Sequence, residues 1–177
     1  MIGYNFRLGE IEAAIGIEQL KKLSGFVASR QRAAERLSRG LSALPGLRTP
    51  VVKPGCTHAY YMYPMLLDLD RIGVTRAQLI EALEAEGVEG LTAGYACLHL
   101  LPMYQKKMAY GSKGFPWSSD ICQRDVSYAK GICPVAERLN ESDYLGYEMC
   151  LHQMSDDECD LLVAAFQKVW DNIGALA

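Results

Sequence analysis

The spacing of apolar positions predicts that the chain begins with a long helical segment. Apolar side chains recur every three or four residues over residues 8–23 and again over residues 26–44, which is the period of an amphipathic helix. Ser24–Gly25 lies between the two patterns, and Pro45–Gly46 ends the second one. The segment is therefore either one long helix or a helical hairpin, with Ser24–Gly25 as the place for a break or kink.

Beyond residue 46 the pattern changes to short extended stretches. Residues 47–52 (LRTPVV), 58–70 (HAYYMYPMLLDLD) and 87–95 (GVEGLTAGY) are predicted as strands. Pro64 indicates that the second strand lies at a sheet edge or contains a bulge, because proline has no N–H to give to a neighbouring strand.

Two further helices are marked by their capping residues. Thr75 and Gln78 form a capping box, so a helix should follow them and stop at Gly87. The final helix follows a second capping box, made by Ser155 and Glu158.

The pattern weakens over residues 98–131, where glycine, proline and serine predict a partly ordered surface loop. A short helix is predicted near residues 121–130. The order strand, helix, strand gives the chain α/β or α+β character.

Composition is typical of a globular protein of one ordinary domain, with 177 residues, 50% of them hydrophobic and 22% charged. The formal net charge of -3 argues against a nucleic-acid partner, which usually leaves a basic surface. No apolar run reaches the ~18 residues that a membrane-spanning helix needs. No signal peptide is recognised at the N-terminus, so a cytoplasmic location is expected.

The six cysteines and three histidines do not form a metal-binding pattern. The cysteines are scattered without a CxxC pair, and the histidines are not at zinc-ligand spacing. We therefore expect no metal site, and reduced thiols that are mostly buried.

Two places in the sequence are candidates for binding chemistry. Asn5 and Arg7, beside Tyr4, stand just before a helix start, where side-chain donors and free backbone N–H groups can meet a phosphate or carboxylate. The alternative is a plain helix cap, with Asn5 bound to the first turn and Arg7 in water. His99, in the apolar stretch ACLHLLPMY, is either a ligand-binding residue or a hydrogen-bonded core histidine.

The segment GYNFRLGEIEAAIGIEQLKKL resembles part of the DegT/StrS family of aminotransferases. The resemblance continues in the same order through HAYYMYPMLL, GYACLHLLPMYQ, CPVAERL and DDECDLLVAAFQKVWDN, and so covers nearly the whole chain. Enzymes of this family use pyridoxal 5'-phosphate (PLP), and most of them aminate keto-sugars and related cyclic ketones. The resemblance implies the C-terminal part of such an enzyme, with an α+β fold whose small, mostly antiparallel sheet is packed by helices.

The resemblance also implies roles for the candidate residues and a division of the chain. Asn5 and Arg7, with Tyr4 nearby, would contact the cofactor phosphate of a neighbouring subunit, and His99 would face the substrate. Residues 1–46 would form a helical segment that bridges to a large domain outside this chain, and residues 47–177 would form the small domain.

The family's Schiff-base lysine and the acid that pairs with the pyridine nitrogen lie in the upstream half that the resemblance does not include. We therefore expect the chain to be inactive alone and not to bind PLP by itself, and a separate N-terminal aminotransferase half is a possible partner. The alternative is a non-catalytic oligomerisation or interaction domain derived from the family. Both readings predict a homo-oligomer, because part of the first helix would lack its usual cover.

Overall fold

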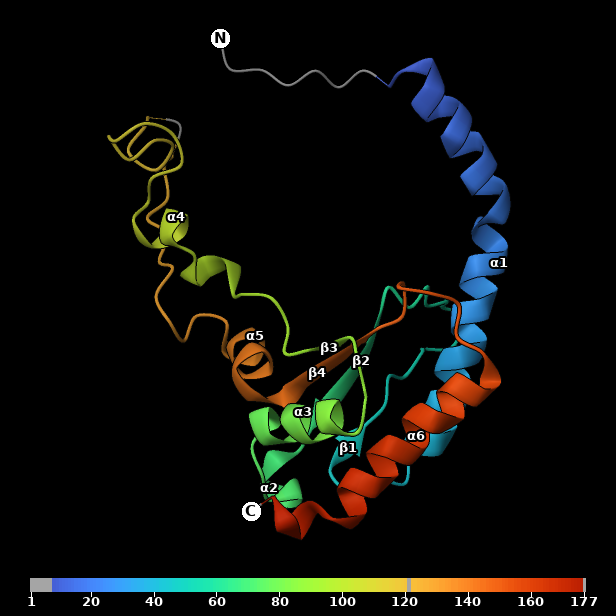
Figure 1. The fold of residues 1–177 in the computed structure, drawn as a ribbon. Coiled ribbons are helices and arrows are strands. Elements are labelled where there is room, and N and C mark those ends of the chain that lie inside the picture. The colour runs from blue at the N-terminus through green and yellow to red at the C-terminus, as the bar shows by residue number, and fades with distance from the viewer. Residues whose placement is uncertain (1–7, 121, 177) are drawn as a thin grey trace.

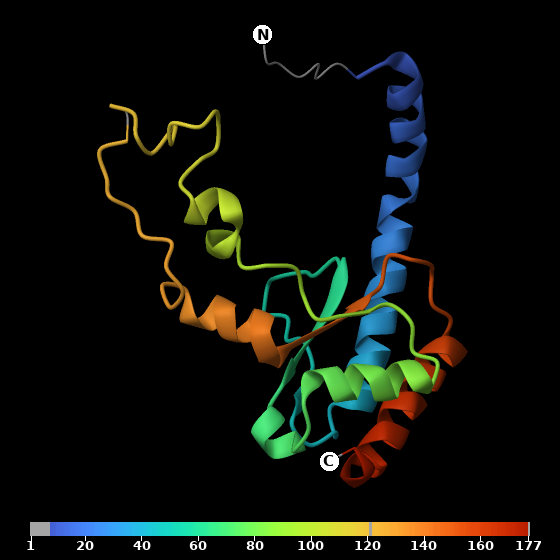
Figure 2. The same ribbon diagram turned by 60° about the vertical axis from the view of Figure 1, so that its left-hand side comes forward.

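The computed structural model describes residues 8–120 and 122–176. A small sheet with helices packed against it forms the body of the molecule, and two long segments extend from this body on the same side (Figure 1). One is the N-terminal half of helix α1 (Glu10–Leu41), and the other, which we call the excursion, comprises residues 98–133. Figure 2 shows that the two segments stand apart from each other.

Helix α1 is one continuous helix from Glu10 to Leu41, so of the two predicted alternatives the hairpin is excluded. The helix continues through Ser24–Gly25, because a single glycine costs a helix interior only about 1 kcal/mol. Its C-terminal half is fixed by packing, with four apolar residues buried in the core: Ala33, Ala34, Leu37 and Leu41.

The sheet has four short strands in the order β1–β2–β4–β3, and all neighbouring strands are antiparallel. The strands are β1 (Leu47–Arg48), β2 (Met62–Leu67), β3 (Leu91–Thr92) and β4 (Tyr144–Glu148). This architecture confirms the α+β class with a small antiparallel sheet packed by helices.

Two details of the sheet depend on single residues. Strand β2 is an inner strand, but β1 pairs only with Leu66 and Leu67, so within the described sheet that side of β2 is open at Pro64. Strand β4 is not predicted by the sequence pattern, because Gly146 inside YLGYE has the character of a turn residue. Glycine is needed there, since a Cβ at this position would lie 2.7 Å from Cγ2 of Thr92 on β3.

The shorter helices are α2 (Leu69–Ile72), α3 (Arg76–Ala85), α4 (Pro102–Gln105), α5 (Pro134–Arg138) and α6 (Asp156–Asp171). Both predicted capping boxes are confirmed, at Thr75 before α3 and at Ser155 before α6. The helix predicted near residues 121–130 is wrong, because residues 122–130 contain no helix. The helix forms later instead, where Pro134 supplies a preset φ and lacks an N–H that would have no helical partner.

One hydrophobic core joins the sheet to helices α1, α3 and α6. Strand β2 alternates between half-buried and buried residues, and the buried ones face this core: Tyr63, Met65 and Leu67. The C-terminal half of α1 therefore packs in the same core as the sheet. Whether residues 1–46 also bridge to a further domain stays a prediction.

The expectation of mostly buried thiols is wrong. All six cysteines are free, but only Cys159 is buried. The others lie in loops and at the excursion, outside the single core that encloses Cys159. Among the described helices none combines the length and the hydropathy that crossing a membrane requires.

Two glycines of α1 test how closely this helix packs. A Cβ on Gly40 would lie 2.6 Å from both γ-carbons of Val163 on α6, whereas a Cβ on Gly25 would meet nothing within 4 Å. We expect Gly25→Ala to raise the free energy of unfolding by about 0.5–1 kcal/mol, because alanine orders a helix better than glycine. We expect Gly40→Ala to lower it by about 1–3 kcal/mol, because the β-branched Val163 cannot turn away. Urea unfolding of the two variants checks this, and equal effects would contradict the close contact of α1 with α6.

Candidate functional site

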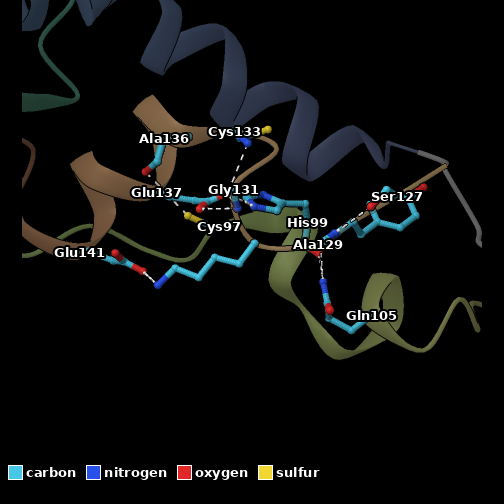
Figure 3. A network of polar contacts seen from close by, with 12 residues as sticks. Cys97, His99, Gln105, Ser127, Ala129, Gly131, Cys133, Ala136, Glu137 and Glu141 are labelled. Atoms are coloured by element: carbon cyan, nitrogen blue, oxygen red, sulfur yellow. Dashed lines mark hydrogen bonds and ion pairs between the residues drawn. The ribbon is translucent and has the colours of Figure 1, made fainter.

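The site forms where the excursion leaves and rejoins the body of the molecule. The outgoing chain passes through a short 3-10 helix, η1 (Leu98–Leu100), which carries His99. The returning chain enters α5, which carries Glu137. Although the two residues are 38 positions apart, His99 Nε2 lies 2.8 Å from Glu137 Oε1 (Figure 3).

Glu137 is the one charged residue that is buried in the described part of the chain, with 5% of its surface exposed. The loop before α5 supplies donors to its carboxylate. The Gly131 N–H lies 2.8 Å from both carboxylate oxygens, and the Cys133 N–H lies 3.2 Å from Oε1. The buried charge therefore has hydrogen-bond partners from two backbone groups and one imidazole, as a buried carboxylate requires.

These contacts decide the ionisation of Glu137. Burial alone would raise the pKa of its carboxyl group. The hydrogen bonds from the Gly131 N–H, from His99 and from the Cys133 N–H act in the opposite direction and outweigh it, so the pKa lies below its ordinary value. Glu137 is therefore ionised at neutral pH.

His99 is held by its backbone as well as by its ring. Its side chain is 11% exposed. The amide Nε2 of Gln105, on α4, donates to the carbonyl oxygen of His99 at 2.7 Å and to that of Tyr128 at 2.6 Å. Gln105 thus connects the outgoing segment of the excursion to the returning segment. Tyr128 also packs against Tyr104 and accepts a hydrogen bond from the Trp117 indole at 3.0 Å.

A groove of about 490 Å³ lies beside His99. Besides His99, its wall includes Tyr95, Cys97, Leu98, Cys133, Ala136, Leu139, Asn140 and Tyr144. Most of this wall is apolar, and His99 contributes the one imidazole to it. Such a mixture, an apolar wall with few polar groups, is typical of a small-molecule site.

Arg76 connects this wall to the body of the protein. Its guanidinium donates to four carbonyl oxygens around the π-helix η2 (Leu139–Asp143), at distances between 2.9 and 3.3 Å. Burial lowers the pKa of Arg76, and nearby Asp143 opposes that shift. These carbonyls lie at the C-terminal end of the α5–η2 segment, which has no further helical N–H groups to bind them. Through them, Arg76 attaches the groove wall formed by α5 and η2 to the start of α3.

The lysines of the described residues differ from the usual environment of a Schiff-base lysine. A Schiff-base lysine needs a depressed pKa, which burial usually supplies. None of the lysines in residues 8–120 and 122–176 is buried, and a hydrogen bond to Glu141 raises the pKa of Lys130. No group of three or more metal-ligand side chains is found among the described residues either. The predicted phosphate-binding residues Tyr4, Asn5 and Arg7 lie outside the described residues.

The sequence interpretation includes His99 but misses its partner. Glu137 stands in CPVAERL, a segment that contributes to the family resemblance without suggesting a role for any one residue. The available signal is an acidic side chain three residues after Pro134, a proline that can start a helix, in the first turns of that helix. Gly131 and Gln105 carry no recognisable signal, because their contacts exist only once the excursion has folded back.

The depressed pKa of Glu137 predicts a pH dependence of stability. A carboxyl group whose pKa is lower in the folded state stabilises fully above its ordinary value of 4.5, and this contribution is lost as the pH falls through the folded value. Between about pH 6 and pH 3, the free energy of unfolding should fall more steeply for the native chain than for Glu137→Gln. Urea unfolding at several pH values measures both slopes, and identical slopes would contradict the account.

The chain is similar in sequence to one family of known proteins. The profile of the DegT/DnrJ/EryC1/StrS aminotransferase family matches residues 1–142. The spore coat polysaccharide biosynthesis protein SpsC of Bacillus subtilis is 33% identical over 125 residues, which cover 71% of this chain and 32% of that protein. The L-glutamine:2-deoxy-scyllo-inosose aminotransferase of Streptoalloteichus tenebrarius is 32% identical over 184 residues, covering 99% of this chain and 41% of that protein.

A solved structure gives the same result for the fold. The aminotransferase TlmJ from Streptoalloteichus hindustanus superposes with a TM-score of 0.64 and 30% identity, over 94% of this chain and 37% of that one. The chain thus spans between 32% and 41% of the length of these three proteins. Because the family profile matches residues 1–142, the chain belongs to the DegT/DnrJ/EryC1/StrS aminotransferase family, whose members are PLP-dependent.

Proposed function

We propose that the chain is the C-terminal part of a PLP-dependent aminotransferase that aminates a keto-sugar or a related cyclic ketone. The observation that carries the proposal is the family match over residues 1–142. Relatives named for spore coat polysaccharide biosynthesis and for amination of 2-deoxy-scyllo-inosose support a polyhydroxylated cyclic substrate. The groove beside His99, with its apolar wall and single imidazole, supports a substrate-facing role for this region.

In this proposal the chain supplies binding groups, and the upstream part of the enzyme supplies the lysine. PLP, when bound, supplies an aldehyde and an electron-accepting ring for the transfer of the amino group. Asn5 and Arg7, with Tyr4 nearby, would hold its phosphate in the neighbouring subunit, since an amide and a planar guanidinium are suitable phosphate donors. His99 would face the substrate. Residues 1–177 alone would then lack the lysine that holds PLP and would not transaminate.

A chimera tests this proposal directly. Residues 1–177 would replace the matching region of the Streptoalloteichus tenebrarius aminotransferase, because the similarity there covers 99% of the chain. We expect the chimera, but not the isolated chain, to show the visible absorbance of lysine-bound PLP and to aminate a cyclic ketone. In the chimera, Arg7→Met should weaken PLP binding about tenfold or more, because it removes a charge-assisted hydrogen bond.

The matched control is Arg32→Met, on the exposed surface of α1, which should leave PLP binding unchanged. A folded chimera that binds no PLP would contradict the proposed function. A chimera that binds PLP equally well with and without Arg7 would contradict only the phosphate assignment.

A second candidate function is supported by the surface of α1. Large apolar residues around its N-terminal half are exposed: Ile11, Ile15, Ile17, Leu20 and Leu23. They are spread around the helix among charged residues such as Glu12 and Lys21, and this number of exposed large apolar side chains is typical of a surface that associates with protein. This surface supports self-association, either within an aminotransferase or in a non-catalytic oligomerisation domain.

We expect the isolated chain to form a homo-oligomer that depends on this surface. The double variant Ile11→Ser with Leu20→Ser should shift the chain toward the monomer, because it removes two residues that are 76% and 69% exposed. The control Glu10→Ser with Gln19→Ser changes neighbouring polar residues and should not. Size-exclusion chromatography with light scattering measures the mass. A native chain that is monomeric at high concentration would exclude the oligomerisation function.

A further inference from the structure

We propose that Glu137 is a positioning residue: it holds the proton of the His99 imidazole on Nε2, so that Nδ1 is presented to the groove as a hydrogen-bond acceptor. The inference rests on the proposed function in one respect, namely that His99 faces the substrate. The fixed tautomer itself follows from the contacts around Glu137, and it can be measured without any substrate.

The first step concerns which group carries the proton between the two side chains. An ionised carboxylate is only an acceptor. Oε1 of Glu137 accepts from the Gly131 N–H at 2.8 Å and from the Cys133 N–H at 3.2 Å, and Oε2 also faces the Gly131 N–H at 2.8 Å. A proton on either oxygen would be directed toward these donors or would have to displace them. The 2.8 Å contact therefore needs the hydrogen on His99 Nε2.

The second step concerns the other ring nitrogen. No hydrogen bond among the described residues uses Nδ1 of His99. Among described residues that are not exposed, no side-chain nitrogen or oxygen is both fully enclosed and without a partner. Nδ1 therefore reaches open space. His99 forms part of the groove wall, and in the proposal this accessible nitrogen faces the groove, where a ligand can bind it.

The third step concerns rigidity. The main chain of His99 is tied by Gln105, which also binds the Tyr128 carbonyl on the returning strand (Figure 3). Glu137 is tied to the loop at Gly131 and Cys133. Both partners of the His99–Glu137 pair are thus fixed by backbone contacts, which is the arrangement that keeps an imidazole in one orientation.

The consequence is a specific capability at one atom. Neutral His99 can accept a hydrogen bond from a substrate hydroxyl or N–H at Nδ1. When a proton is transferred to Nδ1, the ring becomes an imidazolium. Its Nε2–H still donates a hydrogen bond to Glu137, and this carboxylate stabilises the positive charge of the ring. This is the role of an orienting carboxylate behind a histidine, in which the carboxylate itself is not protonated.

Nuclear magnetic resonance of the 177-residue chain tests the tautomer. With ¹⁵N-labelled histidine, we expect the neutral His99 ring to carry its proton on Nε2, and we expect this N–H to exchange slowly with water. In Glu137→Gln the N–H should exchange faster, and a second tautomer should appear, because a glutamine amide can donate as well as accept. The control Glu141→Gln removes a nearby exposed carboxylate that binds Lys130 instead, and it should leave the His99 signals unchanged. A proton on Nδ1 in the native chain, or identical signals in Glu137→Gln, would overturn the proposal.

Kinetics of the active chimera test whether the positioning is used. We expect Glu137→Gln to lower kcat/KM about 10- to 100-fold, as removal of an orienting partner commonly does, while PLP absorbance is kept. His99→Gln keeps a polar atom near the position of Nε2 and loses Nδ1, and it should lower kcat/KM at least as much. The double variant should be no worse than His99→Gln, because the two residues act as a unit.

Three outcomes are separated by these experiments. If His99→Gln lowers activity and Glu137→Gln does not, the positioning role is overturned while the proposed function stands. If neither variant affects activity, His99 does not face the substrate, and the catalytic use of the pair is overturned. If the chimera has no aminotransferase activity, the proposed function fails, and the resonance measurement alone decides the tautomer.

Discussion

The arrangement of the site depends on the burial of one carboxylate. A buried ion is tolerated only where hydrogen-bond donors replace water, and Glu137 obtains its donors from two different chain segments. Those segments are the outgoing and returning ends of the excursion, so the hydrogen bonds to this one carboxylate close the loop at its base. The orientation of His99 at the wall of the groove depends on that closure (Figure 3).

The closed base is in turn attached to the core by a half-buried arginine. Arg76 stands at the start of α3, whose Leu79 and Leu83 are fully buried, and its guanidinium binds carbonyls of η2 directly after α5. A movement of α5 relative to the core would therefore break hydrogen bonds from a charged donor, each of which contributes about 1.5–3 kcal/mol net when it is buried and less when it is exposed. The base of the site is thus held by hydrogen bonds, whereas the excursion extends away from the body (Figures 1 and 2).

How far the sequence predicts this structure depends on the range of the determining contacts. The helices α3 and α6 are predicted because Thr75 and Ser155 fix their starts through residues three positions away. Strand β4 is missed because Gly146 is selected by Tyr144 and by Thr92 of another strand, and the misplaced helix near residues 121–130 reflects weak local signals. The same holds for the site: His99 carries a recognisable context, whereas the role of Glu137 exists only through Gly131, Cys133 and His99 in space. The fold class was therefore predictable, and the hydrogen-bonded core of the site was not.

The N-terminal half of α1 and the excursion extend from the same side of the body, and the site lies at the base of the excursion. Helix α1 has two environments along its length: its C-terminal half is part of the core, and its N-terminal half carries exposed large apolar residues. The excursion extends on the same side of the body as that exposed half (Figure 2). In the proposed homo-oligomer, the protein that covers the exposed half of α1 would lie on the side of the body toward which the excursion also extends. The proposal therefore places the covering protein near the excursion, whose base carries His99.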